Sequence, residues 1–198
     1  MLPDYFVYFG VAFNAVGATS YLVAMARGQA TPNRVSWSLW ALAPMIAFAA
    51  EVDEGVGPQS WLTFMAGAGP AAIFLTSFFV GGTWRIGRLD VVCGALALAG
   101  IGLWVVTQNG VLAIALAIAA DGLAAVPTFV KAYRYPRTES PWVYWLGATG
   151  AAITMLTIDH WNVAHYGFPV YLFGMGMLVG VLVTFRVGQR LGRRAPVA

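Results

Sequence analysis

Long apolar stretches alternate with short polar connections along almost the whole chain. The predicted spans are residues 5–26, 35–50, 60–80, 89–107, 111–130, 141–158 and 167–187. Each is close to the roughly 20 residues that an α-helix needs to cross about 30 Å of hydrocarbon. The pattern therefore predicts an all-α integral membrane protein with seven transmembrane helices.

The charged residues indicate how these spans are oriented. All 11 Lys and Arg residues fall in alternate connections or in the C-terminal tail, at Arg27, Arg34, Arg85, Arg88, Lys131, Arg134, Arg137, Arg186, Arg190, Arg193 and Arg194. Acidic residues on the opposite side are Asp4, Glu51, Asp53, Glu54 and Asp159. Cytoplasmic connections keep an excess of Lys and Arg. We therefore expect an external N-terminus and a cytoplasmic C-terminus, in the inner (plasma) membrane of a prokaryote.

Composition excludes other classes of protein. The chain is 60% hydrophobic and 10% charged, which leaves too few charged groups for a soluble globular surface. The net charge of +3 is spread over connections next to the membrane, where it favours contact with lipid head groups and not with a nucleic acid. The single cysteine, Cys93, lies inside a predicted span, and we expect it to be a packing residue.

A repeated pattern predicts how the spans are grouped. A proline followed by two tryptophans opens the second span and again the sixth, as Pro32, Trp37 and Trp40 and as Pro136, Trp142 and Trp145. An offset of about 105 residues relates the two patterns, so that spans one to three correspond to spans five to seven. The result is a 3+1+3 parallel repeat: a first three-helix repeat at 1–88, a linker helix at 89–110, and a second three-helix repeat with a basic cytoplasmic tail at 111–198.

The 3+1+3 arrangement resembles that of the SWEET and PQ-loop transporter superfamily, of which the chain would be a distant member. In span five, Pro127-Thr128 stands where that superfamily carries its helix-bending Pro-Gln or Pro-Leu pair. The resemblance covers almost the whole chain. It implies an outside N-terminus, an inside C-terminus and the transport of a small solute.

Asp121 lies about midway along span five, where an ionisable side chain is costly unless it faces a cavity or a partner. It could exchange a proton during transport, accept a hydrogen bond from a solute or bind a cation. The alternative is a structural hydrogen bond to span one, through Asn14. Asn14 lies within about one helical turn of the position that the repeat assigns to Asp121, so the two side chains could meet near a central axis.

Aromatic residues and prolines complete the predicted site. Thr149 follows Trp145 by four residues and shares its helix face, and Pro44 holds the same place after Trp40. The tryptophans could stack on a ring-shaped solute, or they could anchor the helices at the membrane interface. Pro44 and Pro127 each remove one helical hydrogen bond and are candidate hinges. The predicted solute-binding residues are Asn14, Trp40, Asp121, Trp145 and Thr149.

The chain gives no signal of a metal, a cofactor or an enzyme. His160 and His165 are five residues apart, so a metal would need further ligands such as Glu51 or Asp53, and we expect a solvated connection instead. Nucleophile-elbow, phosphate-loop and zinc-protease motifs are missing from the sequence. The sequence favours a membrane transporter of a small polar or ring-containing solute that works by alternating access. Proton coupling and a homo-oligomer stay open, and the alternative is a seven-helix receptor, sensor or assembly protein without transport activity.

Overall fold

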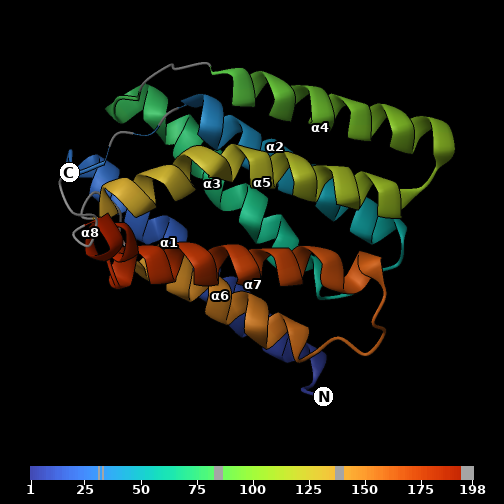
Figure 1. The fold of residues 1–198 in the computed structure, drawn as a ribbon. Helices are drawn as coiled ribbons and strands as arrows, with labels where there is room; N and C mark the ends of the chain where they lie inside the picture. The colour runs from blue at the N-terminus through green and yellow to red at the C-terminus, as the bar shows by residue number, and fades with distance from the viewer. Residues whose placement is uncertain (31, 33, 83–86, 137–140, 193–198) are drawn as a thin grey trace.

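The computed structural model describes residues 1–30, 32, 34–82, 87–136 and 141–192, and these residues form helices and no strands. Figure 1 shows the long helices running between the same two ends of the molecule. They are α1 (Val7–Ala26), α2 (Arg34–Asp53), α3 (Ser60–Val80), α4 (Arg88–Thr107), α5 (Gly110–Arg134), α6 (Pro141–Met155) and α7 (Val163–Thr184). A short 3-10 helix, Asp4–Phe6, precedes α1, and a short helix α8, Val187–Gly192, follows α7.

Five of these helices are long and apolar enough to cross a membrane: α1 with its preceding turn, α2, α3, α5 and α7. The apolar part of α4, Val91–Thr107, is shorter. The 15 residues of α6 extend over about 22 Å at 1.5 Å per residue. Among the described residues, the predicted helices are therefore confirmed as long and apolar enough to cross a membrane for five of the seven predicted spans.

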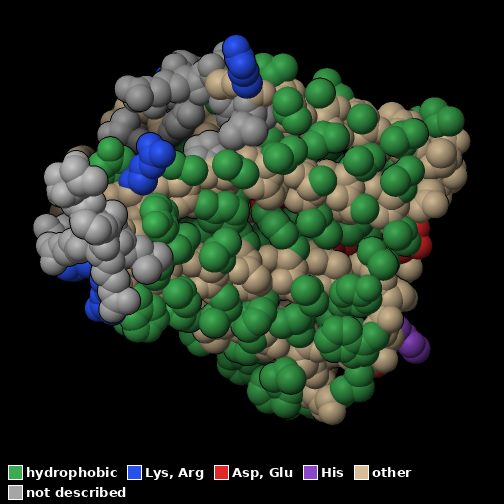
Figure 2. Space-filling model, in the orientation of Figure 1, with side chains coloured by type: hydrophobic (Ala, Val, Ile, Leu, Met, Phe, Trp, Pro, Cys, Tyr) green, Lys and Arg blue, Asp and Glu red, His purple; other side chains and the backbone are tan. Residues whose placement is uncertain are grey.

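Charges gather at the two ends of the helices. The acidic end carries the N-terminus and the α2–α3, α4–α5 and α6–α7 connections (Figure 1), and Figure 2 shows Asp, Glu and His side chains there. The basic end carries α8 and the α1–α2 connection, and the visible Lys and Arg side chains gather there. Between the ends, large apolar side chains face outward, among them Leu98, Leu75 and Val16 with 69%, 59% and 57% exposure. Such a surface fits hydrocarbon on its outside.

Two helix boundaries differ from the prediction in ways that matter for the site. Helix α2 continues to Asp53 and so includes Glu51, which the sequence placed in a connection. Helix α7 begins at Val163 because the Asn162 side chain caps it, accepting a hydrogen bond from the His165 backbone N–H at 3.1 Å. The expectation that His165 lies in a solvated connection is therefore wrong, since this residue belongs to the first turn of α7.

For description, α1, α2 and α3 are called the first helix group and α5, α6 and α7 the second, with α4 between them in the chain. Helix α3 packs against both α1 and α2, and α7 packs against both α5 and α6. Between the groups, α1 packs against α6 and α2 packs against α5, while α4 covers α5 and part of α2. The buried apolar clusters centre on α2, α5 and α7 and consist largely of alanines with single larger residues such as Phe168 and Ile114. Small side chains allow membrane helices to approach closely.

The two groups approach each other closely where α1 crosses α6. A Cβ atom at Gly10 would lie 2.6 Å from the Gly150 carbonyl oxygen, and a Cβ at Gly150 would lie 2.6 Å from the Gly10 carbonyl oxygen. No side chain fits at these distances. The two glycines therefore bring the backbones of α1 and α6 into direct contact.

Candidate functional site

Asp121 lies on α5 and is 3% exposed. The Tyr171 hydroxyl of α7 donates a hydrogen bond to the Asp121 Oδ2 atom at 2.6 Å. Gly122 makes room for this ring, since a Cβ there would already lie 3.6 Å from Tyr171 Cε2. Asp121 therefore has a polar partner, and this partner comes from α7 and not from α1, where the structural alternative placed it.

Asn14 lies apart from Asp121. Its Nδ2 atom donates to the Gly10 carbonyl oxygen of its own helix at 3.3 Å, and a Cβ at Gly150 of α6 would lie 2.7 Å from it. Helix α1 packs on α3 and α6, whereas α5 packs on α2, α4 and α7. The described contacts therefore do not bring Asn14 and Asp121 together.

The two tryptophans differ in their surroundings. The Trp40 Nε1 atom is buried and has no hydrogen-bond partner, and its ring meets Trp37 edge-on with centroids 5.2 Å apart. The Trp145 Nε1 atom donates to Thr184 Oγ1 at 2.9 Å, and its ring lies against Gly180 of α7. Trp145 thus links α6 to α7 by a hydrogen bond, whereas the indole N–H of Trp40 has no acceptor among the described residues.

The remaining predicted residues are also placed. Thr149 is exposed on α6. Pro44 is buried inside α2. Pro127 lies within the helical range of α5, but its side chain lies outside the described residues. The cavity shared by the five solute-binding candidates stays a prediction. A surface hollow lined by Ala15, Val16, Thr19 and Ser20 of α1 includes none of those candidates.

Glu51 is a buried polar residue that sequence reasoning left in a connection. It is 1% exposed, and its Oε1 atom accepts a hydrogen bond from Thr63 Oγ1 of α3 at 3.0 Å. Its Oε2 atom is buried without a hydrogen-bond partner. The sequence held a signal for this placement, because Glu51 follows the apolar run of α2 without a glycine or proline to end the helix.

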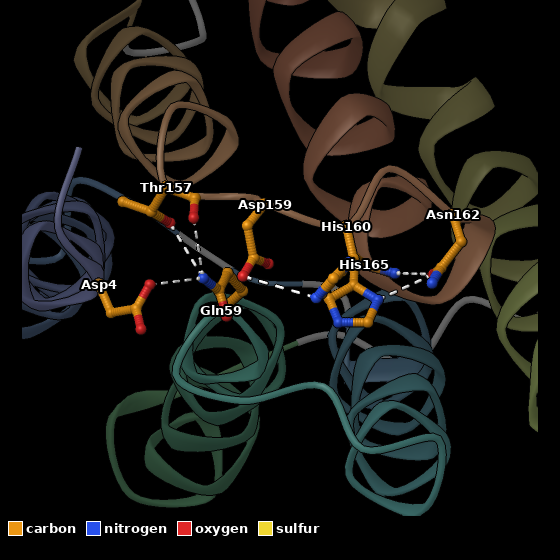
Figure 3. A network of polar contacts seen from close by, with 7 residues as sticks. All are labelled: Asp4, Gln59, Thr157, Asp159, His160, Asn162 and His165. Carbon is orange, nitrogen blue, oxygen red and sulfur yellow. Dashed lines mark hydrogen bonds and ion pairs between the residues drawn. The ribbon is translucent and has the colours of Figure 1, made fainter. Parts of the chain in front are cut away.

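At the acidic end, hydrogen bonds join the two helix groups (Figure 3). The Gln59 Nε2 atom donates to the Thr157 carbonyl oxygen at 3.2 Å and contacts Asp4 Oδ1 at 3.2 Å. Nearby, the Gly110 backbone N–H donates to Glu54 Oε1 at 2.9 Å. Gln59 is only 5% exposed, so its bond to Thr157 is sheltered from water. We call the bonds made by Gln59 and Glu54 the acidic-end bridge.

The histidines at this end do not form a metal site with their described neighbours. His160 Nε2 lies 3.7 Å from Asp159 Oδ2, and both side chains are largely exposed. His165 Nδ1 lies 2.8 Å from the Asn162 side-chain oxygen (Figure 3). Within the part of the chain that the structure describes, no three His, Cys, Asp or Glu residues are grouped as metal ligands.

The fold and these contacts define a class: an all-helical protein with five helices suited to crossing a membrane and with enclosed carboxyl groups on two of them. No family model, curated protein or solved structure matches the chain.

Proposed function

We propose that the chain is a seven-helix membrane transporter of a small polar or ring-containing solute, in the inner membrane of a prokaryote, with its acidic end outside and its basic end in the cytoplasm. The two three-helix groups would rock against each other to open one end at a time. The distribution of charge supports this orientation, since basic connections are retained on the cytoplasmic side.

The observation that carries the proposal is the reciprocal packing of the helices. In each group the third helix packs against the first and the second. If α1, α2 and α3 are matched with α5, α6 and α7, the contact of α1 with α6 corresponds to the contact of α5 with α2, and both contacts are present. This pattern supports a parallel 3+1+3 repeat of SWEET-like type, in which α4 is the linker that keeps both copies in one orientation.

Matching glycines support the same correspondence. A Cβ at Gly67 of α3 would lie 3.1 Å from the Ala41 carbonyl oxygen of α2. A Cβ at Gly176 of α7 would lie 2.8 Å from the Tyr144 carbonyl oxygen of α6. Each glycine also faces the backbone N of the residue four positions after that carbonyl. The third helix of each group therefore meets the second helix through the same contact.

Polar groups in the interior support a solute or ion pathway. Asp121 is a carboxyl group within the apolar bundle, with Tyr171 as its donor. Trp40 offers a buried N–H donor that has no acceptor among the described residues. In membrane helices such groups are costly, and they commonly mark the route of a solute or proton. We propose that Asp121 exchanges the coupling proton and that Asn14, Trp40, Trp145 and Thr149 face the solute when the groups move, with Pro44 and Pro127 as hinges.

The direct test is reconstitution of the purified protein into liposomes and measurement of the uptake of radiolabelled sugars, amino acids and vitamins. We expect at least one solute to enter faster than into protein-free liposomes. If none of the panel enters faster, transport is contradicted for these solute classes, and the receptor or assembly alternative is favoured.

A further inference from the structure

Glu51 is the starting point, because its carboxyl group is only half satisfied. Thr63, which is 0% exposed, donates to the Glu51 Oε1 atom at 3.0 Å. The Oε2 atom is enclosed and has no hydrogen-bond partner. A buried polar atom without a partner costs free energy, and an ionised one costs much more.

No cation among the described residues compensates a charge on Glu51. Helix α3, which supplies its hydrogen bond, contains no ionisable Asp, Glu, Lys, Arg or His. Besides Glu51, the charged or titratable residues of α2 and of the elements packed against it are Arg34, Asp53 and Glu54 at the ends of α2, Arg88, Asp90 and Cys93 of α4, Asp121, Lys131, Tyr133 and Arg134 of α5, and His165, Tyr166 and Tyr171 of α7. In the described part of the chain, the contact of a carboxylate with a basic side chain joins Asp159 and His160 and leaves Glu51 out.

The enclosure of Oε2 limits what can bind there. Metal cations such as Ca²⁺ and Mg²⁺ take six or more ligands, mostly oxygen atoms. At Glu51 the described partner is the single hydroxyl of Thr63, and no group of three metal-ligating side chains is present among the described residues. A proton needs no added volume and neutralises the carboxylate. It is therefore the ligand that the site can hold without rearrangement.

The connection that follows Glu51 is linked to the second helix group. The Val56 backbone N–H donates to the Glu51 carbonyl oxygen at 2.8 Å, which folds the α2–α3 connection back over the end of α2. The same connection carries Glu54 and Gln59, the two residues of the acidic-end bridge, which bind Gly110 and Thr157. Separation of the two groups at this end would displace that connection from the end of α2.

We propose that Glu51 is a proton-binding site. The carboxyl group carries a proton while the acidic end is closed and releases it to water when the acidic-end bridge breaks. The step moves one proton from Glu51 to solvent and leaves an ionised carboxylate in an opened, hydrated end. The link to opening rests on the proposed transport function, whereas the presence of the proton in the closed state does not.

The test is infrared spectroscopy of the purified protein in micelles during a pH titration, without any solute. We expect a C=O stretching band of a protonated carboxyl group at neutral pH that is lost in Glu51→Gln and kept in the control Asp53→Asn, which changes an exposed carboxylate two residues away and outside the acidic-end bridge. Asp121→Asn must leave this band in place. A band that persists unchanged in Glu51→Gln, or that is missing from the wild type, would overturn the proposal.

Thr63→Val gives a second arm that keeps the carboxyl group. Loss of the hydroxyl donor to Oε1 should shift the frequency of the Glu51 band, and an unshifted band would contradict the assignment even if Glu51→Gln failed to fold.

In liposomes, accumulation driven by a pH gradient across the solute panel should fall in Glu51→Gln to the level of protein-free liposomes. A Glu51 band without uptake of any solute would refute the transport function alone. Uptake without the band would refute the proton site alone.

Discussion

Asp121 and Glu51 are both enclosed carboxyl groups, yet only one of them could be recognised from the sequence. Asp121 is isolated in the middle of an apolar run, so its cost in hydrocarbon is evident from its position. Glu51 stands among Asp53 and Glu54 at a span end, where a solvated connection is the ordinary expectation. Its burial depends on the fold of the α2–α3 connection and on Thr63, and neither follows from periodicity.

The bond between Tyr171 and Asp121 predicts a measurable contribution to stability. In Tyr171→Phe the ring remains and the donor to Asp121 Oδ2 is lost, so the free energy of unfolding should fall by about 1 to 2 kcal/mol. Thermal unfolding in detergent would measure the change. Tyr166→Phe, which removes a hydroxyl from the first turn of the same helix, is the control. Equal melting temperatures for the two variants would show that the Asp121 bond adds nothing to stability.

The crossing of α1 and α6 predicts a second residue-scale effect. Gly10→Ala places a methyl group 2.6 Å from the Gly150 carbonyl oxygen, so the helices must separate, at a cost of about 1 to 3 kcal/mol. Gly174→Ala makes the same change on α7, where nothing lies within 4 Å of the new Cβ. We expect the first variant to melt well below wild type and the second to melt at or slightly above it. The reverse order would contradict the described crossing.

At the scale of helices, apolar length and charge predicted the elements well but not all of their ends. Helix α3 begins and ends at the predicted residues, because polar connections border it sharply. Helix α7 begins earlier than predicted, since the Asn162 cap acts locally and leaves little trace in hydropathy. The acidic-end bridge was not predicted, because Gln59 and Thr157 are 98 residues apart in the sequence.

Loss of the bridge should shift the helix groups toward an open acidic end. In a Cys93→Ala background, Ser60→Cys places a thiol at a position that is 3% exposed at that end. Adding Gln59→Leu removes the donor to Thr157 while keeping the size of the side chain. We expect a membrane-impermeant maleimide to label the thiol several-fold faster than without Gln59→Leu, as free energies near 1 kcal/mol per bond imply. Gln29→Leu, at an exposed glutamine of the basic end, should leave the rate unchanged. Equal labelling in all three proteins would refute a gating role of the bridge.

At the scale of the whole molecule, the repeat stays a prediction, and the sequence and the helix contacts support different registers for it. The sequence offset pairs Gly69 with Gly174, whereas the glycine contacts support a pairing of Gly67 with Gly176. A single offset assumes equal connections in both halves, and the connections here differ in length. The central meeting of Asn14 and Asp121 was expected on the same basis, but α1 and α5 are not packed against each other in the described structure.

Orientation in the membrane is testable without knowledge of the solute. Because the described Arg residues lie at the basic end, we expect a reporter fused after Ala198 to be active only in the cytoplasm. A reporter fused before Met1 should be active only outside. The opposite result for both fusions would reverse the proposed orientation.

The measurement that tests the central claim most directly compares wild type and Asp121→Asn in liposomes, using whichever solute of the panel the wild type transports. We predict that an imposed pH gradient drives accumulation by the wild type and not by Asp121→Asn, and that Asp121→Asn still exchanges internal for external solute. Loss of both activities in a folded variant would make Asp121 a solute ligand. Accumulation by Asp121→Asn equal to that of the wild type would contradict the role of this carboxyl group in transport.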